Sequence, residues 1–223
     1  VSAMSRRRME RGTWIACVGP IGVGKSTLAA VVARRTGALF VPERFGDNAF
    51  LERFYGPDGI KRWGFQTEVS FLTQRVDQVR EIEALLAVGR SVVTDFTPQQ
   101  NLIFARITVD RLEYDLYQQL YDRLFGALPR PDRLICLDAD LRTILRRIRS
   151  RARSMESGIP SAYIRKLRAG YLTWHDTPPA PTLWIDTSKM PIPSDLVARA
   201  AALDAVMHSL DPETRRALFG REG

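Results

Sequence analysis

The chain is poor in cysteine and in long apolar runs. Its 223 residues include only two cysteines, Cys17 and Cys136. Each lies inside an apolar segment, so we interpret both as buried, unpaired thiols rather than a disulfide or a metal pair. No apolar run approaches the roughly 18 residues that a membrane span needs. The basic residues Arg6–Arg8 precede a strand pattern rather than an apolar leader, so we expect no signal peptide and a cytoplasmic location.

Lysine is also scarce, although the chain is strongly basic. The 33 basic and 25 acidic side chains give a net charge of +8, which suits polyanionic ligands from nucleotide phosphates to nucleic acid. Only four of the basic residues are lysines, and six arginines lie within residues 142–153. The charge alone does not choose between these ligands, but the arginine cluster indicates a local function.

Short apolar runs alternate with longer helical patterns along the chain. We predict strands at 13–19, 38–43, 91–96, 133–139 and 182–188, and helices at 26–35, 63–88, 112–126, 140–153, 161–174 and 194–208. The alternation predicts an α/β fold with a doubly wound, parallel, five-stranded sheet flanked by helices. We expect one domain over residues 1–223, a disordered N-terminus at 1–12 and a frayed tail at 211–223.

A glycine-rich segment follows the first predicted strand and opens the first predicted helix. It reads GPIGVGKST and matches the phosphate-binding pattern GxxxxGK[ST]. Glycines let backbone N–H groups turn toward a phosphate, the lysine reaches the β- and γ-phosphate oxygens, and the serine hydroxyl can bind Mg²⁺. We therefore predict that ATP is bound by Gly19, Pro20, Ile21, Gly22, Val23, Gly24, Lys25, Ser26 and Thr27.

Two predicted strands end in an aspartate that could hold Mg²⁺ beside Ser26. Asp95 ends the third strand, which in kinases with this loop usually lies next to the first strand. Asp138 ends the fourth strand and precedes Ala139 and Asp140, where a capping or turn role is the better interpretation. We therefore expect Asp95 to be the metal-linked carboxylate.

Three further segments resemble the deoxynucleoside kinase family. They read FVPERFGDNAFLERFY, GFQTEVSFLTQR and LRRIRSRARSMESGIPSAYIRKLRAGYLTWH, and they follow the phosphate loop in the family's order. The resemblance implies transfer of the γ-phosphoryl group of Mg²⁺-bound ATP to the 5′-hydroxyl of a deoxynucleoside. It also implies an arginine-rich lid at about 147–160 and a homodimer, for which the apolar face of 69–88 could serve.

The resemblance assigns roles to individual residues. Glu43 corresponds to the general base for the 5′-hydroxyl, and Tyr55 and Glu156 correspond to the residues that hold the sugar 3′-hydroxyl. Gln66 corresponds to the glutamine that reads the base, and Asn101 lies where the family often has an aspartate that assists it. This pair admits several bases, among which we expect purines, with deoxyadenosine first.

The lid and the aromatic walls complete the implied site. Arg147, Arg151 and Arg153 match the lid arginines, which would neutralise charge on the transferring phosphoryl group. The other three arginines of the cluster, Arg142, Arg146 and Arg149, fit an exposed helix face. Phe65, Trp63 and Phe104 could stack on the base or belong to the core.

One departure from the family pattern affects the acceptor pocket. The family's Glu-Arg-Ser reads Asp95-Phe96-Thr97 here, so an arginine that helps to hold the acceptor end is missing. Arg75 and Arg106 are the candidates to replace it.

Three other functions remain open from the sequence. A nucleoside monophosphate kinase of the thymidylate kinase kind would need to hold an acceptor phosphate, which Glu43 would repel, although Arg44 keeps it possible. In a nucleic-acid-binding ATPase the basic side chains would contact DNA or RNA, and we do not expect a nucleic acid partner. A kinase for another small alcohol such as shikimate would not need the Tyr55-to-Gln66 segment.

Overall fold

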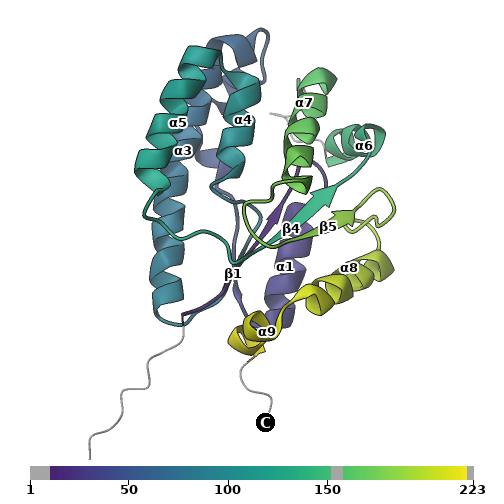
Figure 1. The fold of residues 1–223 in the computed structure, drawn as a ribbon. Helices are drawn as coiled ribbons and strands as arrows, with labels where there is room; N and C mark the ends of the chain where they lie inside the picture. Colours follow the sequence, from purple (N-terminus) through teal and green to yellow (C-terminus); the bar gives the residue numbers. More distant parts are fainter. Residues whose placement is uncertain (1–10, 152–157, 220–223) are drawn as a thin grey trace, which may run out of the picture.

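Five parallel strands form one sheet at the centre of the molecule (Figure 1). The computed structural model describes residues 11–151 and 158–219. Within these ranges the strands are β1 Trp14–Val18, β2 Leu39–Val41, β3 Val92–Thr94, β4 Arg133–Asp138 and β5 Thr182–Asp186, in the spatial order β2-β3-β1-β4-β5. β3 is paired with β1, with Ala16 opposite Thr94. The predicted five-stranded parallel sheet is confirmed, and it brings the end of β3 beside the phosphate loop.

Helices cover both faces of this sheet, as the doubly wound prediction requires. They are α1 Lys25–Thr36, α2 Leu51–Phe54, α3 Gly59–Ala87, α4 Gln100–Thr108, α5 Arg111–Phe125, α6 Leu141–Arg151, α7 Ser161–Leu172, α8 Leu196–Ser209 and α9 Pro212–Phe219. Figure 1 shows α3, α4 and α5 side by side as one group, with α1 and α8 grouped separately. None of the helices in the described ranges is long and apolar enough to cross a membrane.

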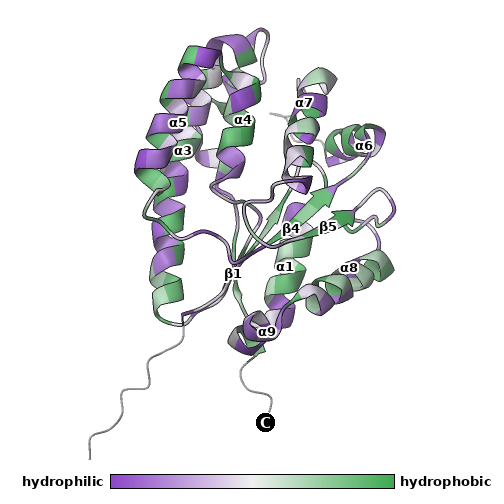
Figure 2. Ribbon diagram, viewed as in Figure 1, coloured by the Kyte–Doolittle hydropathy of each residue, from purple (hydrophilic) through white to green (hydrophobic). Residues whose placement is uncertain are grey.

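The strand β1 shows why the sheet needs two helical layers. Ile15 and Cys17 pack into the cluster that contains α1, whereas Ala16 and Val18 pack into the cluster that contains the C-terminal half of α7. Successive side chains point to opposite faces of a strand, so a strand that is apolar at every position must be covered on both sides. Figure 2 shows the resulting hydrophobic colour along the central strands. Both cysteines are free and buried, as predicted.

The short helix α2 and the helices α4 and α9 were not predicted. α4 has only nine residues, too few to establish a helical period against its polar start. α9 occupies residues that we expected to be frayed. The Asp211 carboxylate accepts a hydrogen bond from the Thr214 backbone N–H at 2.8 Å and pairs with Arg133 at 3.0 Å. These contacts cap the first turn of α9 and attach it to β4, so the prediction of an irregular tail was wrong over 212–219.

The apolar face of residues 69–88 is used inside the molecule. Leu72, Val76, Val79, Ile82 and Leu86 are buried in one core cluster with β1, β3 and α5. A face that is already packed cannot also form a subunit interface, so the suggestion that it serves a dimer was wrong. A homodimer remains a prediction that would need another surface.

Candidate active site

The phosphate loop runs from the end of β1 to the first turn of α1. Gly19, Gly22 and Gly24 have φ angles of 140°, 87° and 105°, in the region that side chains other than glycine rarely adopt. A Cβ atom on Gly19 would lie 2.1 Å from the Leu137 carbonyl oxygen. The turn into α1 therefore depends on glycine, and it directs the N-terminus of a helix to the place where phosphates would bind.

Lys25 is the first residue of α1 and its side chain reaches back over the loop. Its Nζ atom donates a hydrogen bond to the Pro20 carbonyl oxygen at 3.1 Å. Lys25 also lines the pocket described below, together with Ser26 and with Ile21 and Gly22 of the loop. These positions agree with the predicted phosphate contacts, which themselves remain predictions.

Asp95 connects the phosphate loop to Glu43. One of its carboxylate oxygens accepts a hydrogen bond from the Ser26 hydroxyl. The other accepts a hydrogen bond from the Glu43 backbone N–H at 2.7 Å. Because β3 lies between β1 and β2, the residue that follows it can reach both neighbours. Asp95 thus fixes the distance between the loop and the residue predicted to be the general base.

Arg75 and Gln100 hold the Glu43 side chain, and the sequence analysis gave neither this role. Arg75 donates a hydrogen bond to Glu43 Oε1, and Gln100 Nε2 donates to the same oxygen at 3.0 Å. The Gln100 amide is oriented in turn by the Tyr171 hydroxyl, which donates to its Oε1 at 3.3 Å. Arg75 was considered as a substitute for the missing arginine, but nothing in the sequence pointed to Gln100, which lies on the unpredicted helix α4.

A pocket of about 840 Å³, its open mouth included, lies against these groups. Its wall combines phosphate-loop residues, polar groups and apolar side chains. The lining comprises Ile21, Gly22, Lys25, Ser26, Glu43, Phe45, Leu51, Phe54, Tyr55, Thr67, Glu68, Phe71, Arg75, Asp95, Gln100, Asn101, Phe104, Arg151 and Tyr163. A pocket in which apolar walls are combined with convergent polar groups is typical of a small-molecule site.

The structure places Gln66 outside this pocket. Its side chain is exposed, whereas Thr67 and Glu68 are buried and line the wall. Residues two positions apart on an α-helix point in directions about 200° apart, so Gln66 and Glu68 face opposite ways. The assignment of Gln66 as the base reader was therefore wrong. Glu43, Tyr55 and Asn101, the other predicted substrate-binding residues in the described ranges, do line the pocket.

Glu68 is a buried carboxyl group that the sequence analysis missed. Its side chain is 2% exposed. Burial raises its pKa to about 8, although the Thr108 hydroxyl and the positive charge of Arg75 oppose this shift. Perturbed titratable groups are concentrated at functional sites, and an acidic residue among the apolar positions of α3 was the signal that could have identified it.

The lid arginines have different positions. Arg151 lines the pocket. Arg147 does not line it and instead donates hydrogen bonds to Thr187 Oγ1 at 2.9 Å and to the Thr187 carbonyl oxygen at 2.7 Å. Burial lowers the pKa of Arg147 from its usual value. The catalytic role predicted for Arg147 does not fit this position, and Arg153 and Glu156 lie outside the described residues.

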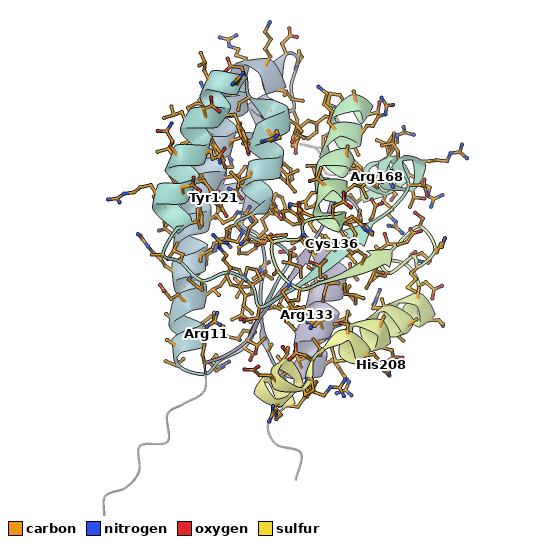
Figure 3. The ribbon with its side chains drawn as sticks, viewed as in Figure 1. Arg11, Tyr121, Arg133, Cys136, Arg168 and His208 are labelled. Carbon is orange, nitrogen blue, oxygen red and sulfur yellow. The ribbon has the colours of Figure 1, made fainter. Side chains whose placement is uncertain are left out.

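Asp138 belongs to an ion pair rather than to a cap or to the pocket. Arg168 on α7, labelled in Figure 3, donates to its carboxylate from Nε at 2.8 Å and from NH2 at 2.7 Å. The capping of α6 is performed by Asp140, whose carboxylate accepts a hydrogen bond from the Thr143 N–H at 2.8 Å. The preference for Asp95 over Asp138 agrees with this arrangement, but the capping role suggested for Asp138 was wrong.

The three aromatic residues proposed as stacking walls also lie in different places. Phe104 lines the pocket, whereas Phe65 packs at the edge of the core and Trp63 stacks with Phe50, their ring centroids 6.0 Å apart. The pocket receives further aromatic walls from residues that we had not assigned. These are Phe45, Phe54, Phe71 and Tyr163.

Comparisons with known proteins agree with this geometry. The profile of the family described as "Deoxynucleoside kinase" matches residues 15–210. The chain belongs to the deoxynucleoside kinase family. It is 36% identical over 164 residues to a "Deoxyguanosine kinase" of Bacillus subtilis, covering 73% of this chain and 78% of that protein. It is 31% identical over 179 residues to a "Deoxyadenosine/deoxycytidine kinase" of the same organism, covering 77% and 80%.

A solved structure shows that the fold is shared with this family as well. The structure described as "deoxyadenosine kinase from M.mycoides with bound dATP" superposes with a TM-score of 0.73 at 24% identity, over 88% of this chain and 97% of that one. As a deoxynucleoside kinase, the chain is a phosphotransferase, and the resemblance noted in its sequence is confirmed.

Proposed function

We propose that this deoxynucleoside kinase transfers the γ-phosphoryl group of Mg²⁺-bound ATP to the 5′-hydroxyl of a purine deoxynucleoside. The proposal rests chiefly on the hydrogen bonds by which Asp95 joins Ser26 of the phosphate loop to Glu43. Both residues face one pocket, so a triphosphate on the loop and a hydroxyl beside Glu43 would lie close enough to react. Holding two reactants in this way is a large part of phosphoryl-transfer catalysis.

The donor end of the site consists of the loop, Lys25, Ser26 and Asp95. Backbone N–H groups and the α1 N-terminus would bind the phosphates, and Lys25 would neutralise their charge. Ser26 and Asp95 offer a hydroxyl and a carboxylate, the hard oxygen ligands that Mg²⁺ prefers alongside phosphate oxygens and water. These two residues therefore fit the ion, which would supply charge neutralisation at the transferring phosphoryl group.

The acceptor end is organised around Glu43. Its carboxylate is held by Arg75 and Gln100, which leaves one fixed side chain beside the place for the 5′-hydroxyl. Glu43 would remove the hydroxyl proton as the oxygen attacks, since a carboxylate within hydrogen-bond reach is a competent general base. Tyr55 lines the same pocket and would hold the sugar, while Arg151 would approach the phosphates from α6.

A purine acceptor is supported by the relatives and by the pocket. Four of the family relatives are described as deoxyguanosine kinases, and others as deoxyadenosine kinases. Phe71 and Phe104 supply apolar walls on which a flat base could lie. The deoxyadenosine preference expected from Gln66 loses its basis, because Gln66 lies outside the pocket.

The test is a panel of the four deoxynucleosides, their ribose counterparts and their 5′-monophosphates, each with Mg²⁺ and ATP, with products separated by charge. We expect deoxynucleoside monophosphates to accumulate from purine deoxynucleosides. Formation of diphosphates from the monophosphates would instead indicate the thymidylate-kinase alternative. ATP hydrolysis stimulated by DNA or RNA, without a phosphorylated small product, would indicate the nucleic-acid ATPase.

Two further expectations belong to this proposal. We propose a homodimer, and sedimentation velocity at several protein concentrations would test it. Leu112 and Leu116 on α5 are exposed by 80% and 49%, so they offer apolar surface that the buried face of α3 does not. The cytoplasmic location also stays a prediction, and fractionation of cells that make the protein would test it.

A further inference from the structure

Thr187 directly follows β5 and has no role in the reaction proposed above. Its side chain is fully buried, and it does not line the pocket. A hydroxyl group that is removed from water without hydrogen-bond partners costs free energy, so the partners of this hydroxyl show what the residue holds in place.

The Thr187 hydroxyl brings three other segments together. Its Oγ1 atom lies 3.1 Å from the Val23 carbonyl oxygen in the phosphate loop and 3.0 Å from the Asp138 carbonyl oxygen at the end of β4. It also accepts a hydrogen bond from the guanidinium group of Arg147 on α6 at 2.9 Å. The phosphate loop, β4, β5 and α6 therefore meet at one side chain.

The single proton of this hydroxyl belongs to the phosphate loop. A threonine hydroxyl has one proton and two lone pairs, and the bond from Arg147 occupies a lone pair. The Asp138 carbonyl oxygen already accepts the Thr187 backbone N–H at 2.7 Å, so the hydroxyl donates to the Val23 carbonyl oxygen. Arg147 approaches the same oxygen at 3.4 Å.

The Val23 carbonyl group needs such a hold because its neighbours are glycines. Gly22 and Gly24 have φ angles of 87° and 105°, and glycine restricts the rotation of the backbone less than other residues do. The Val23 C=O and the Gly24 N–H belong to one planar trans peptide unit, so they point in opposite directions. A contact that fixes this carbonyl therefore also fixes the direction of the Gly24 N–H.

The outer side of the loop is packed by the same two segments. A Cβ atom on Gly22 would lie 3.0 Å from Cγ1 of Ile148 on α6, and one on Gly24 would lie 3.2 Å from Cγ of Pro193, which follows β5. The opposite side of the loop faces the pocket, which Gly22, Lys25 and Ser26 line. The Val23 carbonyl thus points toward α6 and Thr187, and the Gly24 N–H points away from them.

We propose that Thr187 is a positioning residue that holds the Val23–Gly24 peptide so that the Gly24 N–H is directed at the phosphates of the donor. The inference rests on the proposed function, since it concerns the donor of the same reaction. Arg147 completes the hold by bonding to the Thr187 hydroxyl and carbonyl oxygen. An N–H group that is already directed at a phosphate needs no reorganisation when the ligand binds.

The experiment compares the wild type with Thr187→Val, Thr187→Ser and Thr182→Val. Valine keeps the shape of the side chain and removes the hydroxyl, whereas serine keeps the hydroxyl. Thr182 is the matched control, because it starts β5, at the opposite end of the strand from Thr187, and its hydroxyl donates to the Ala180 carbonyl oxygen at 2.7 Å. The measurements are the Kd of a non-hydrolysable ATP analogue with Mg²⁺, the KM values of ATP and of a deoxynucleoside, kcat and a melting curve.

We expect Thr187→Val to weaken binding of the analogue and to raise the KM of ATP by about 10-fold, the factor that the loss of one buried hydrogen bond produces. The KM of the deoxynucleoside, and kcat at saturating ATP, should stay within about 3-fold of the wild type, because the lost contact serves the ground state and the transition state alike. Thr187→Ser should restore ATP binding. Thr182→Val should bind ATP as the wild type does, even if it melts at a lower temperature.

A double variant tests whether Arg147 acts through Thr187. If the two residues hold one peptide unit together, Thr187→Val combined with Arg147→Met should weaken ATP binding by less than the product of the two single effects. A full product would show that each residue supports the loop separately, and it would overturn the shared hold.

The outcomes for this inference and for the proposed function can be told apart. If the wild type phosphorylates no deoxynucleoside, the proposed acceptor is wrong, but binding of the ATP analogue needs no acceptor and still tests Thr187. If the wild type is active and a folded Thr187→Val binds the analogue normally, only this inference is overturned. If Thr187→Val does not fold, the comparison of Thr187→Ala with Thr187→Ser replaces it, and failure of both hydroxyl-free variants to fold would show a purely structural role and overturn the inference.

Discussion

The guanidinium group of Arg75 lies over the ring of Phe96, 4.7 Å from the ring centroid. Phe96 occupies the position after Asp95 where the family pattern has an arginine. Arg75 on α3 therefore supplies the positive charge that is missing at position 96, and its guanidinium group lies directly over Phe96. The Nε and NH1 atoms of Arg75 are buried without a hydrogen-bond partner in the described part of the chain, so they remain available to a ligand.

Arg75→Met should lower turnover by on the order of 10²-fold, because the variant loses the hydrogen bond that positions Glu43 and misplaced catalytic groups reduce rate on this scale. Arg75→Lys should recover only part of the loss, since a lysine cannot provide the planar guanidinium over Phe96. The measurement is kcat at saturating ATP and nucleoside, with a melting curve for each variant.

Arg106→Met is the matched control for Arg75. Arg106 was the other candidate to replace the missing arginine, but its side chain is exposed and lies over the ring of Tyr114, 4.9 Å from the centroid. We expect a rate close to that of the wild type. A large loss in Arg106→Met, with a normal rate in Arg75→Met, would show that the charge comes from α4 instead.

The parallel sheet, the phosphate loop and the place of Asp95 could be predicted because each depends on local sequence. Apolar strands, three glycines before a lysine and an acidic residue at a strand end all leave a pattern within a few residues. The pairing of the third strand with the first is usual in kinases with this loop, and in the structure it brings Ser26 and Asp95 together.

The polar wall of the pocket could not be predicted in the same way. Whether Gln66 or Glu68 faces the pocket depends on the rotation of α3, and an error of two residues reverses the side of the helix. Gln100 and Asn101 lie on α4, whose nine residues carry no clear period. Arg147 lies one helical turn before Arg151, and only packing against Thr187 shows that the two arginines have different roles.

Lys25→Ala should abolish nearly all turnover while the protein remains folded. The lysine carries the charge that the loop backbone lacks, and removal of one preorganised group that stabilises transition-state charge typically costs on the order of 10²-fold or more in rate. Product formation and a thermal melt would be measured together. Lys61 on α3 is an exposed lysine, so Lys61→Ala should match the wild type; a near-normal rate in Lys25→Ala would refute the role of the loop.

Glu43→Gln should lower kcat by on the order of 10²-fold, the usual contribution of a general base. Glutamine preserves the size of the side chain and can still accept the hydrogen bonds from Arg75 and Gln100, so binding of the nucleoside should change little. The exposed carboxylate of Glu52 on α2 provides the control Glu52→Gln. An unchanged kcat in Glu43→Gln would move the proton-accepting role to Asp95, which the corresponding Asp95→Asn variant would then test.

Arg147→Met should lower the free energy of unfolding by about 2 kcal/mol, the scale of a hydrogen bond to a charged group. Arg147 joins α6 to Thr187 after β5 and approaches the Val23 carbonyl oxygen of the phosphate loop at 3.4 Å. The variant should also bind ATP more weakly, because the loop loses this support. At saturating ATP, however, kcat should recover to within about 3-fold of the wild type. The variant loses binding that the ground state and the transition state share, and it keeps the interactions that stabilise the transition state alone.

Arg149→Met, which removes an exposed arginine from the same helix, should change neither property. A loss of kcat on the order of 10³-fold at saturating ATP, with normal stability, would instead return Arg147 to the lid as a charge-neutralising residue.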